Sequence, residues 1–151
     1  MRPVAAYPGP MTVVDRLREV APEVLRGTPV TVAYLFGSYA RDEARSDSDV
    51  DIAVLLDRSE ADPEHDLDLT DRLAERLERS VGARVDPFLV LDAAPLRLVG
   101  RVLRDRVVLY SRDETHRVSF ETRMGPQALD YELKAAALDR RLLLDFASGR
   151  R

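Results

Sequence analysis

The order of hydrophobic and polar positions along the chain predicts six helical segments and four strands. Apolar residues that recur every three or four positions indicate helices with one buried face, and runs of branched and aromatic residues indicate buried strands. The predicted helices cover residues 11–26, 39–44, 64–80, 95–103, 112–123 and 127–147. The predicted strands cover residues 30–36, 49–56, 84–91 and 106–110. Glycine at 125 and proline at 126 are expected to break the chain between the last two helices.

The alternation of helices and strands predicts an α/β (α+β) fold with a mixed sheet of three or four strands, flanking helices and a long C-terminal helix. A length of 151 residues and a hydrophobic content of 45% suit one globular domain with a substantial core. Residues 1–10 contain proline and glycine and are predicted to form a flexible tail. Residues 11–110 are expected to form the main domain, with 111–151 as a helical extension packed on it.

Composition narrows the classes of function. The formal net charge is −4 and the pI is about 5.3, which argues against a protein whose main task is to bind nucleic acid. Without cysteine the chain has no disulfide and no thiolate metal site. It also lacks an apolar run of the roughly 20 residues that a membrane helix needs. We therefore expect a cytoplasmic protein without direct contacts to membranes or nucleic acid.

Two acidic residues stand at the entrance of the strand DVDIAVLL, residues 49–56. Side chains two positions apart leave a strand on the same face, so Asp49 and Asp51 are expected to lie roughly 6–7 Å apart. Like charges at this separation repel by on the order of 2–3 kcal/mol at an effective dielectric near 20. A bound divalent cation would offset the repulsion. Taken alone, D-x-D fits two solvent-exposed aspartates equally well.

A calcium loop is the sharpest alternative metal site, because Asp47, Asp49 and Asp51 read D-x-D-x-D. Such a loop requires glycine at its sixth position and glutamate at its twelfth. These positions hold Ile52 and Arg58, and the segment continues as a strand. The pattern therefore excludes a calcium loop.

A glycine–serine pair precedes the acidic residues, with ten residues in between. Gly37 and Ser38 follow the predicted strand 30–36 and open a short helix. Glycine lets the backbone turn and a ligand approach, and the N–H groups and serine hydroxyl at a helix start can bind an anion. By itself the pair fits an ordinary turn. Together with two carboxylates that can bind magnesium, it predicts a site for a nucleoside triphosphate.

The stretch GSYARDEARSDSDVD, residues 37–51, resembles the G-S-x10-D-x-D signature of the polymerase-β-type nucleotidyltransferase superfamily. The resemblance implies a polymerase-β-like fold, with ATP as substrate and residues 11–110 as the nucleotidyltransferase domain. It also implies that Gly37 and Ser38 hold the triphosphate, while Asp49 and Asp51 bind two magnesium ions. Transfer of the nucleotidyl group would then depend on both metal ions.

The same resemblance implies a third carboxylate on the next strand, which ligates metal and can accept the proton of the attacking hydroxyl. Asp86 in ARVDPFLVL is the expected residue, and Asp92 at the far end of the strand is the alternative. Pro87 departs from the family pattern, in which an apolar residue follows the aspartate. Since proline cannot donate a ladder hydrogen bond, this strand is expected to start irregularly or to lie at an edge.

Two arginines lie between the glycine–serine pair and the acidic pair. Arg41 and Arg45 could neutralise phosphate charge and so belong to the nucleotide site. They could equally form surface ion pairs with Asp42, Glu43 or Asp47.

The stretch LDAAPLRLVGRVLRDRVVLYSRDETHRVSFE, residues 91–121, resembles the minimal nucleotidyltransferase (MNT) antitoxins of HEPN/MNT toxin–antitoxin pairs. This resemblance implies transfer of AMP from ATP to a tyrosine of a HEPN ribonuclease toxin, which the antitoxin also binds. Two alternatives stay open: an aminoglycoside-type adenylyltransferase that modifies a small molecule, and an antitoxin that acts by binding alone.

The last predicted helix, residues 127–147, carries two apolar flanks, broader than a surface helix of a small domain requires. One flank consists of Tyr131, Ala135, Leu138, Leu142 and Phe146. The other consists of Leu129, Leu133, Ala136, Leu143 and Ala147. Packing on the sheet accounts for at least one flank, and the other is expected to dock the protein partner.

Overall fold

The computed structural model describes residues 9–149, so nearly all of the predicted tail, residues 1–10, lies outside the described residues. The helices are α1 (Val13–Leu25), α2 (Gly37–Ala40), α3 (Asp66–Val81), α4 (Leu96–Asp105) and α5 (Glu114–Ala147). The strands are β1 (Val30–Phe36), β2 (Asp51–Leu56), β3 (Leu89–Val90) and β4 (Val107–Ser111). Short 3-10 turns cover Pro63–His65 and Leu91–Ala93. None of these helices is both long and apolar enough to cross a membrane.

The four strands form one mixed sheet in the order β3-β2-β1-β4. The central strand β1 pairs antiparallel with both β2 and β4, and β2 pairs parallel with β3. The predicted mixed sheet is therefore confirmed. Its two central strands read as nearly unbroken apolar runs because helices cover both faces of the sheet.

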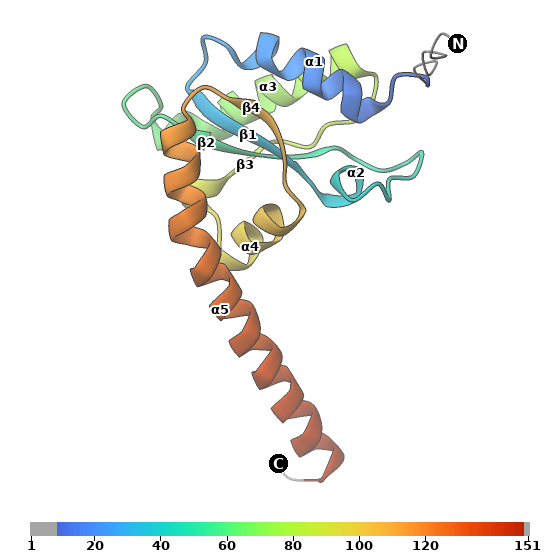
Figure 1. The fold of residues 1–151 in the computed structure, drawn as a ribbon, viewed down its shortest axis with the longest axis vertical. Coiled ribbons are helices and arrows are strands. Elements are labelled where there is room, and N and C mark those ends of the chain that lie inside the picture. The colour runs from blue at the N-terminus through green and yellow to red at the C-terminus, as the bar shows by residue number, and fades with distance from the viewer. Residues whose placement is uncertain (1–8, 150–151) are drawn as a thin grey trace, which may run out of the picture.

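Alternate side chains of β1 enter two separate cores. Ala33 and Leu35 face α1 and α3, whereas Val32 and Tyr34 face α4 and the first part of α5. Figure 1 shows α1 and α3 on one side of the sheet, and α4 and α5 on the other. This arrangement leaves the ends of the strands open, and the predicted motif lies at one of these ends.

The third strand is shorter than predicted. Val85 forms an isolated parallel bridge with Val50, and regular pairing is limited to Leu89–Val90. Pro87 lies between these two contacts and has no N–H to donate, which explains the interruption. The strand also lies at the edge of the sheet, in agreement with the expected effect of the proline.

The predicted break at Gly125 and Pro126 is wrong, because α5 continues through both residues as one 34-residue helix. Proline normally forces the preceding residue out of the helical region by a clash that involves its Cβ. The preceding residue here is Gly125, which has no Cβ, so part of this clash is absent, although the helix still loses the hydrogen bond that the proline nitrogen cannot donate. Phe120 and Ala128 of this helix are buried. Beyond them the helix extends away from the sheet and α4 (Figure 1).

Candidate active site

Strand pairing brings the two parts of the predicted motif together. Phe36, the last residue of β1, is the antiparallel partner of Asp51, the first residue of β2. Gly37 follows β1 with a φ of +74°, in the left-handed region that favours glycine. A Cβ atom at this position would overlap the carboxylate oxygen Oδ2 of Asp51. The turn and the carboxylate therefore touch, and only glycine leaves room for both.

Asp86 lies beside Asp51 on the neighbouring segment of chain. Val50 donates its N–H to the carbonyl oxygen of Arg84 at 2.8 Å, and Asp86 donates its N–H to the carbonyl oxygen of Val50 at 3.1 Å. Val50 and Val85 form the parallel bridge between these segments. The residues that follow them, Asp51 and Asp86, are therefore neighbours with side chains on one face of the sheet.

The electrostatics of this cluster favour a bound cation. Burial raises the pKa of the Asp51 carboxyl, and the carboxylates of Asp86 and Asp49 raise it further. The guanidinium groups of Arg101 and Arg41 oppose this rise. The carboxylates of Asp49 and Asp86 thus both repel that of Asp51, and a divalent cation among the three would relieve this repulsion.

The donor set fits magnesium, a hard cation that prefers carboxylate oxygens. Among residues 9–149, however, no three His, Cys, Asp or Glu side chains are gathered closely enough to hold a metal ion. Asp49 Oδ1 instead lies 3.6 Å from Nε of Arg84, a side chain that is 76% exposed. Exposed pairs of this kind contribute little to stability. The Asp49 carboxylate can therefore leave Arg84 and turn toward a metal ion at small cost.

A hollow of about 550 Å³ opens beside the glycine–serine turn. Its lining consists of Phe36, Gly37, Ser38, Arg41, Asp51, Arg101 and Arg104. A volume of this size suits a small organic ligand. The predicted residue Arg45 is not part of the lining, and its backbone N–H donates to Ser48 Oγ at 2.7 Å.

The arginines at positions 101 and 104 were missed by the sequence analysis. They lie on α4, whose apolar side chains Val99, Val102 and Leu103 are buried against the sheet. A signal was present, because Arg97, Arg101 and Arg104 recur at helical spacing opposite this apolar face. Nothing in the sequence shows that this polar face meets the glycine–serine turn.

Comparison with protein families decides the identity of the fold. Residues 20–115 match the family described as polymerase beta, nucleotidyltransferase. The chain belongs to this family. The resemblance noted for residues 37–51 is thus confirmed at the level of the family, whereas no curated protein matches the chain.

Solved structures agree with this nucleotidyltransferase fold. One is a chain of a toxin–antitoxin crystal structure with AMP-PNP, with 20% identity, a TM-score of 0.58, and coverage of 86% of this chain and 98% of that one. Another comes from the complex of tri-AMPylated Shewanella oneidensis HEPN toxin with MNT antitoxin, with 20% identity, a TM-score of 0.57, and coverage of 90% and 99%. A third Shewanella oneidensis structure has 17% identity, a TM-score of 0.59, and coverage of 84% and 96%. The predicted polymerase-β-like fold is confirmed.

The alternative third carboxylate of this nucleotidyltransferase, Asp92, lies at the opposite end of β2. Its Oδ2 accepts a hydrogen bond of 2.6 Å from Nε of Arg58, just beyond the last residue of β2. The two terminal nitrogens of the same guanidinium donate to both carboxylate oxygens of Asp66 at 2.8 Å. Asp92 therefore belongs to an ion-pair cluster that is separate from the motif.

This separation predicts different effects for two matched substitutions. Asp86→Ala is expected to lower nucleotidyl transfer at least about a hundredfold, because it removes the carboxylate next to Asp51 that is expected to ligate metal and accept the proton. Asp92→Ala should leave transfer within about threefold and instead lower the melting temperature, because Arg58 loses one carboxylate partner. Initial rates with radiolabelled ATP and thermal unfolding measure the two effects. The reverse pattern would exchange the roles of the two residues.

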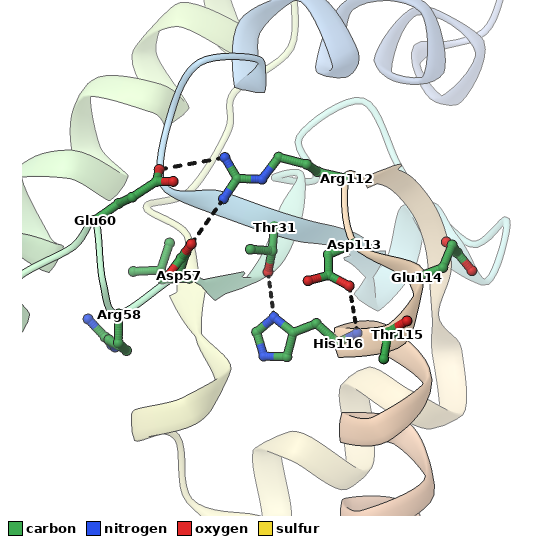
Figure 2. Close-up of a pocket in the computed structure, with 10 residues that line it drawn as sticks. Thr31, Asp57, Arg58, Glu60, Arg112, Asp113, Glu114, Thr115 and His116 are labelled. Carbon is green, nitrogen blue, oxygen red and sulfur yellow. Dashed lines mark hydrogen bonds and ion pairs between the residues drawn. The ribbon is translucent and has the colours of Figure 1, made fainter.

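A second and larger hollow, of about 670 Å³, lies at the other end of the sheet (Figure 2). Its charged groups already have partners, since Arg112 lies 3.7 Å from Asp57 and 3.6 Å from Glu60. His116 Nδ1 lies 2.9 Å from Oγ1 of the buried Thr31. This hollow contains no residue of the nucleotidyltransferase motif. The smaller hollow beside the glycine–serine turn is therefore the candidate active site.

Proposed function

We propose that this chain is an antitoxin nucleotidyltransferase that transfers AMP from ATP to a tyrosine of a cognate HEPN toxin and thereby neutralises it. The observation that carries the proposal is the contact between the Gly37 turn and the Asp51 carboxylate, with Asp86 alongside. It puts an anion-binding turn and metal-binding oxygens at one hollow. The polymerase beta family supports the chemistry. The fold shared with chains of HEPN toxin–MNT antitoxin complexes supports the partner.

In this proposal, Asp49, Asp51 and Asp86 would hold two magnesium ions, whose positive charge would activate the attacking hydroxyl and stabilise the leaving pyrophosphate. Gly37 lets the terminal phosphates approach the backbone, and the Ser38 hydroxyl donates a hydrogen bond to one of them.

Asp86 accepts the proton of the tyrosine hydroxyl while the tyrosine oxygen forms its bond to the α-phosphorus. The bond between the α-phosphorus and the bridging oxygen breaks, and pyrophosphate carries away the electron pair. Arg41 and Arg45 neutralise phosphate charge, and Arg45 would have to turn inward from its loop to do so.

The test combines the protein with ATP, magnesium and the small helical protein encoded by the adjacent gene. We expect mass spectrometry to show AMP added to a tyrosine of that partner, in whole multiples of its mass. Parallel reactions contain aminoglycosides or tRNA in place of the partner. Efficient labelling of either, with an unmodified partner, would show that the acceptor is wrong. A partner that is inhibited by binding, without any labelling, would show an antitoxin that acts by binding alone.

We further propose that residues 11–110 perform the transfer and that residues 111–151 form the extension that docks the toxin. The second half of α5 supports this division, because the large apolar side chains of both predicted flanks are exposed, and the expectation that one flank packs on the sheet is wrong. On one flank Leu138 is 58% and Phe146 is 79% exposed, and on the other Leu143 is 70% exposed. A helix with apolar residues on two faces gains most free energy when a partner covers both.

Substitutions on α5 are expected to separate docking from nucleotide binding. Leu138→Asp and Leu143→Asp should each weaken the complex with the toxin at least about tenfold, because an exposed apolar contact becomes a desolvated charge. ATP affinity and melting temperature should stay unchanged, since both side chains are exposed in the isolated chain. Gln127→Asp introduces the same charge on the same helix outside both flanks and is the matched control. Gel filtration and calorimetry measure the complex. Undiminished binding by both leucine variants would locate the docking surface elsewhere.

A further inference from the structure

The three arginines of the candidate active site differ in how their charges are balanced. Arg41 donates to Asp105 Oδ2 at 2.6 Å and to Glu43 Oε2 at 2.9 Å. Arg104 lies 3.5 Å from Asp105 and 3.7 Å from Glu132. Arg101 forms no ion pair with any residue of the described part, 9–149. Among these described residues no carboxylate lies within ion-pair distance of the Arg101 guanidinium, and Asp51 of the same lining interacts with it only at longer range.

The position of Asp105 explains why the Arg41 side chain is held by an ion pair. The Asp105 side chain is only 4% exposed and lies at the C-terminal end of α4. Its pair with Arg41, which follows α2, ties the two helices together across the edge of the hollow. A guanidinium held by two carboxylates gains less from a phosphate, because binding the phosphate means losing existing partners. Arg41 therefore links α2 to α4, and it gains less from a bound phosphate than a guanidinium without an ion pair would.

Arg101, unlike Arg41, is not held by an ion pair with any described residue. It lies three residues before Arg104 on the same helix, and its side chain lines the same hollow as Gly37 and Ser38. By contrast, Arg58 and Arg112 in the second hollow each face two carboxylates. A guanidinium without an ion pair, beside an anion-binding turn, has the charge and the planar donor geometry that a phosphate group requires.

We propose that Arg101 binds the β- and γ-phosphates of the nucleotide and stabilises the pyrophosphate as it leaves. This inference rests on the proposed nucleotidyl transfer and assigns a residue that the family signature does not contain. Negative charge grows on the leaving pyrophosphate when the bond to the α-phosphorus breaks. A guanidinium already in place next to that group lowers the barrier without reorganisation. Arg101 thus contributes to both nucleotide affinity and the rate of transfer.

The test compares Arg101→Ala and Arg101→Lys with Arg97→Ala. Arg97 lies one turn earlier on α4, is exposed, and does not line the hollow, so it is the matched control. Calorimetry with magnesium measures the affinity for ATP, for inorganic tripolyphosphate and for AMP. We expect Arg101→Ala to weaken ATP and tripolyphosphate about 10- to 100-fold, the range for loss of a hydrogen bond to a charged group. AMP affinity should change less than about threefold. Arg101→Lys should lose less ATP affinity than Arg101→Ala, because lysine keeps the positive charge but lacks the planar pair of donors of a guanidinium.

Each outcome has a distinct meaning. Wild-type ATP affinity in Arg101→Ala, with wild-type protein that binds ATP, would overturn the assignment of Arg101 and leave the proposed function intact. Equal weakening of AMP and ATP would overturn the role at the leaving group, because the contact would then be to the α-phosphate. A wild-type protein that binds neither ATP nor tripolyphosphate would overturn the proposed function itself. Melting temperatures should agree among all variants, since both arginines are exposed.

Discussion

Asp51→Asn is expected to lower AMP transfer at least about a thousandfold while the protein stays folded. The carboxylate lies between the Gly37 turn and Asp86, where it would bind both the metal and, through the metal, the phosphates. Asparagine keeps the shape but removes the charge, and metal catalysis contributes several kcal/mol to transfer reactions of this kind. Initial rates of AMP transfer to the partner measure the effect. Asp47→Asn, at an exposed position of the preceding loop, is the control and should keep full activity.

The unfolding temperature of Asp51→Asn shows whether its loss of activity comes from the site alone or from unfolding of the protein. Without metal, Asp51 is partly buried beside two carboxylates, and its ionised form opposes folding. Asp51→Asn should therefore unfold at the same temperature as the wild type, or at a higher one, in the presence of EDTA. Magnesium with a non-hydrolysable ATP analogue should stabilise the wild type but not the variant, because a ligand stabilises only the state that binds it. A variant with near-normal transfer would exclude Asp51 as a metal ligand.

Gly37→Ala is expected to cause the second largest loss, at least about a hundredfold in ATP affinity. The added Cβ would overlap Asp51 Oδ2 and push the carboxylate away from the turn. The residue would also have to keep a φ of +74°, which costs about 1–3 kcal/mol for a residue other than glycine. Calorimetry with ATP and magnesium measures the affinity, and thermal unfolding measures the strain.

Gly27→Ala separates these two causes. Gly27 has nearly the same φ, +75°, but a Cβ there would meet no atom within 4 Å. This control should lower the melting temperature by a similar amount and leave ATP affinity unchanged. If Gly37→Ala binds ATP as tightly as Gly27→Ala does, close packing of the turn against Asp51 is not required for nucleotide binding.

The central sheet and the core motif could be predicted because their signals are local in the chain. The apolar runs of residues 30–36 and 51–56 require cover on both faces, so they predict central strands. The glycine–serine turn and the acidic pair are joined by ten residues that link two adjacent antiparallel strands. Gly37 and Asp51 could hardly be far apart once those strands pair.

Two predictions from the sequence were wrong, because the structure at those positions depends on a neighbouring residue or on a distant strand. Proline at 126 was expected to end a helix, but Gly125 before it removes part of the steric clash. The third strand was predicted too long because pairing on both sides of Pro87 depends on a partner strand.

The sequence by itself determined the family and the central strands, because the spacing of glycine, serine and aspartate and the apolar runs are signals within short stretches of chain. The same spacing predicted the chemical type of the site. Only the tertiary structure decided which distant side chains join that site. Parallel pairing of Val50 with Val85 brings Asp86 beside Asp51, while Arg58 holds Asp92 at the other end of β2. Packing of α4 against the sheet turns its arginine face toward the hollow. Asp105 at the end of this helix pairs with Arg41, whereas Arg101 has no ion-pair partner among residues 9–149. These contacts join residues far apart in the chain, and their positions follow from how whole helices and strands pack, which residue spacing does not encode.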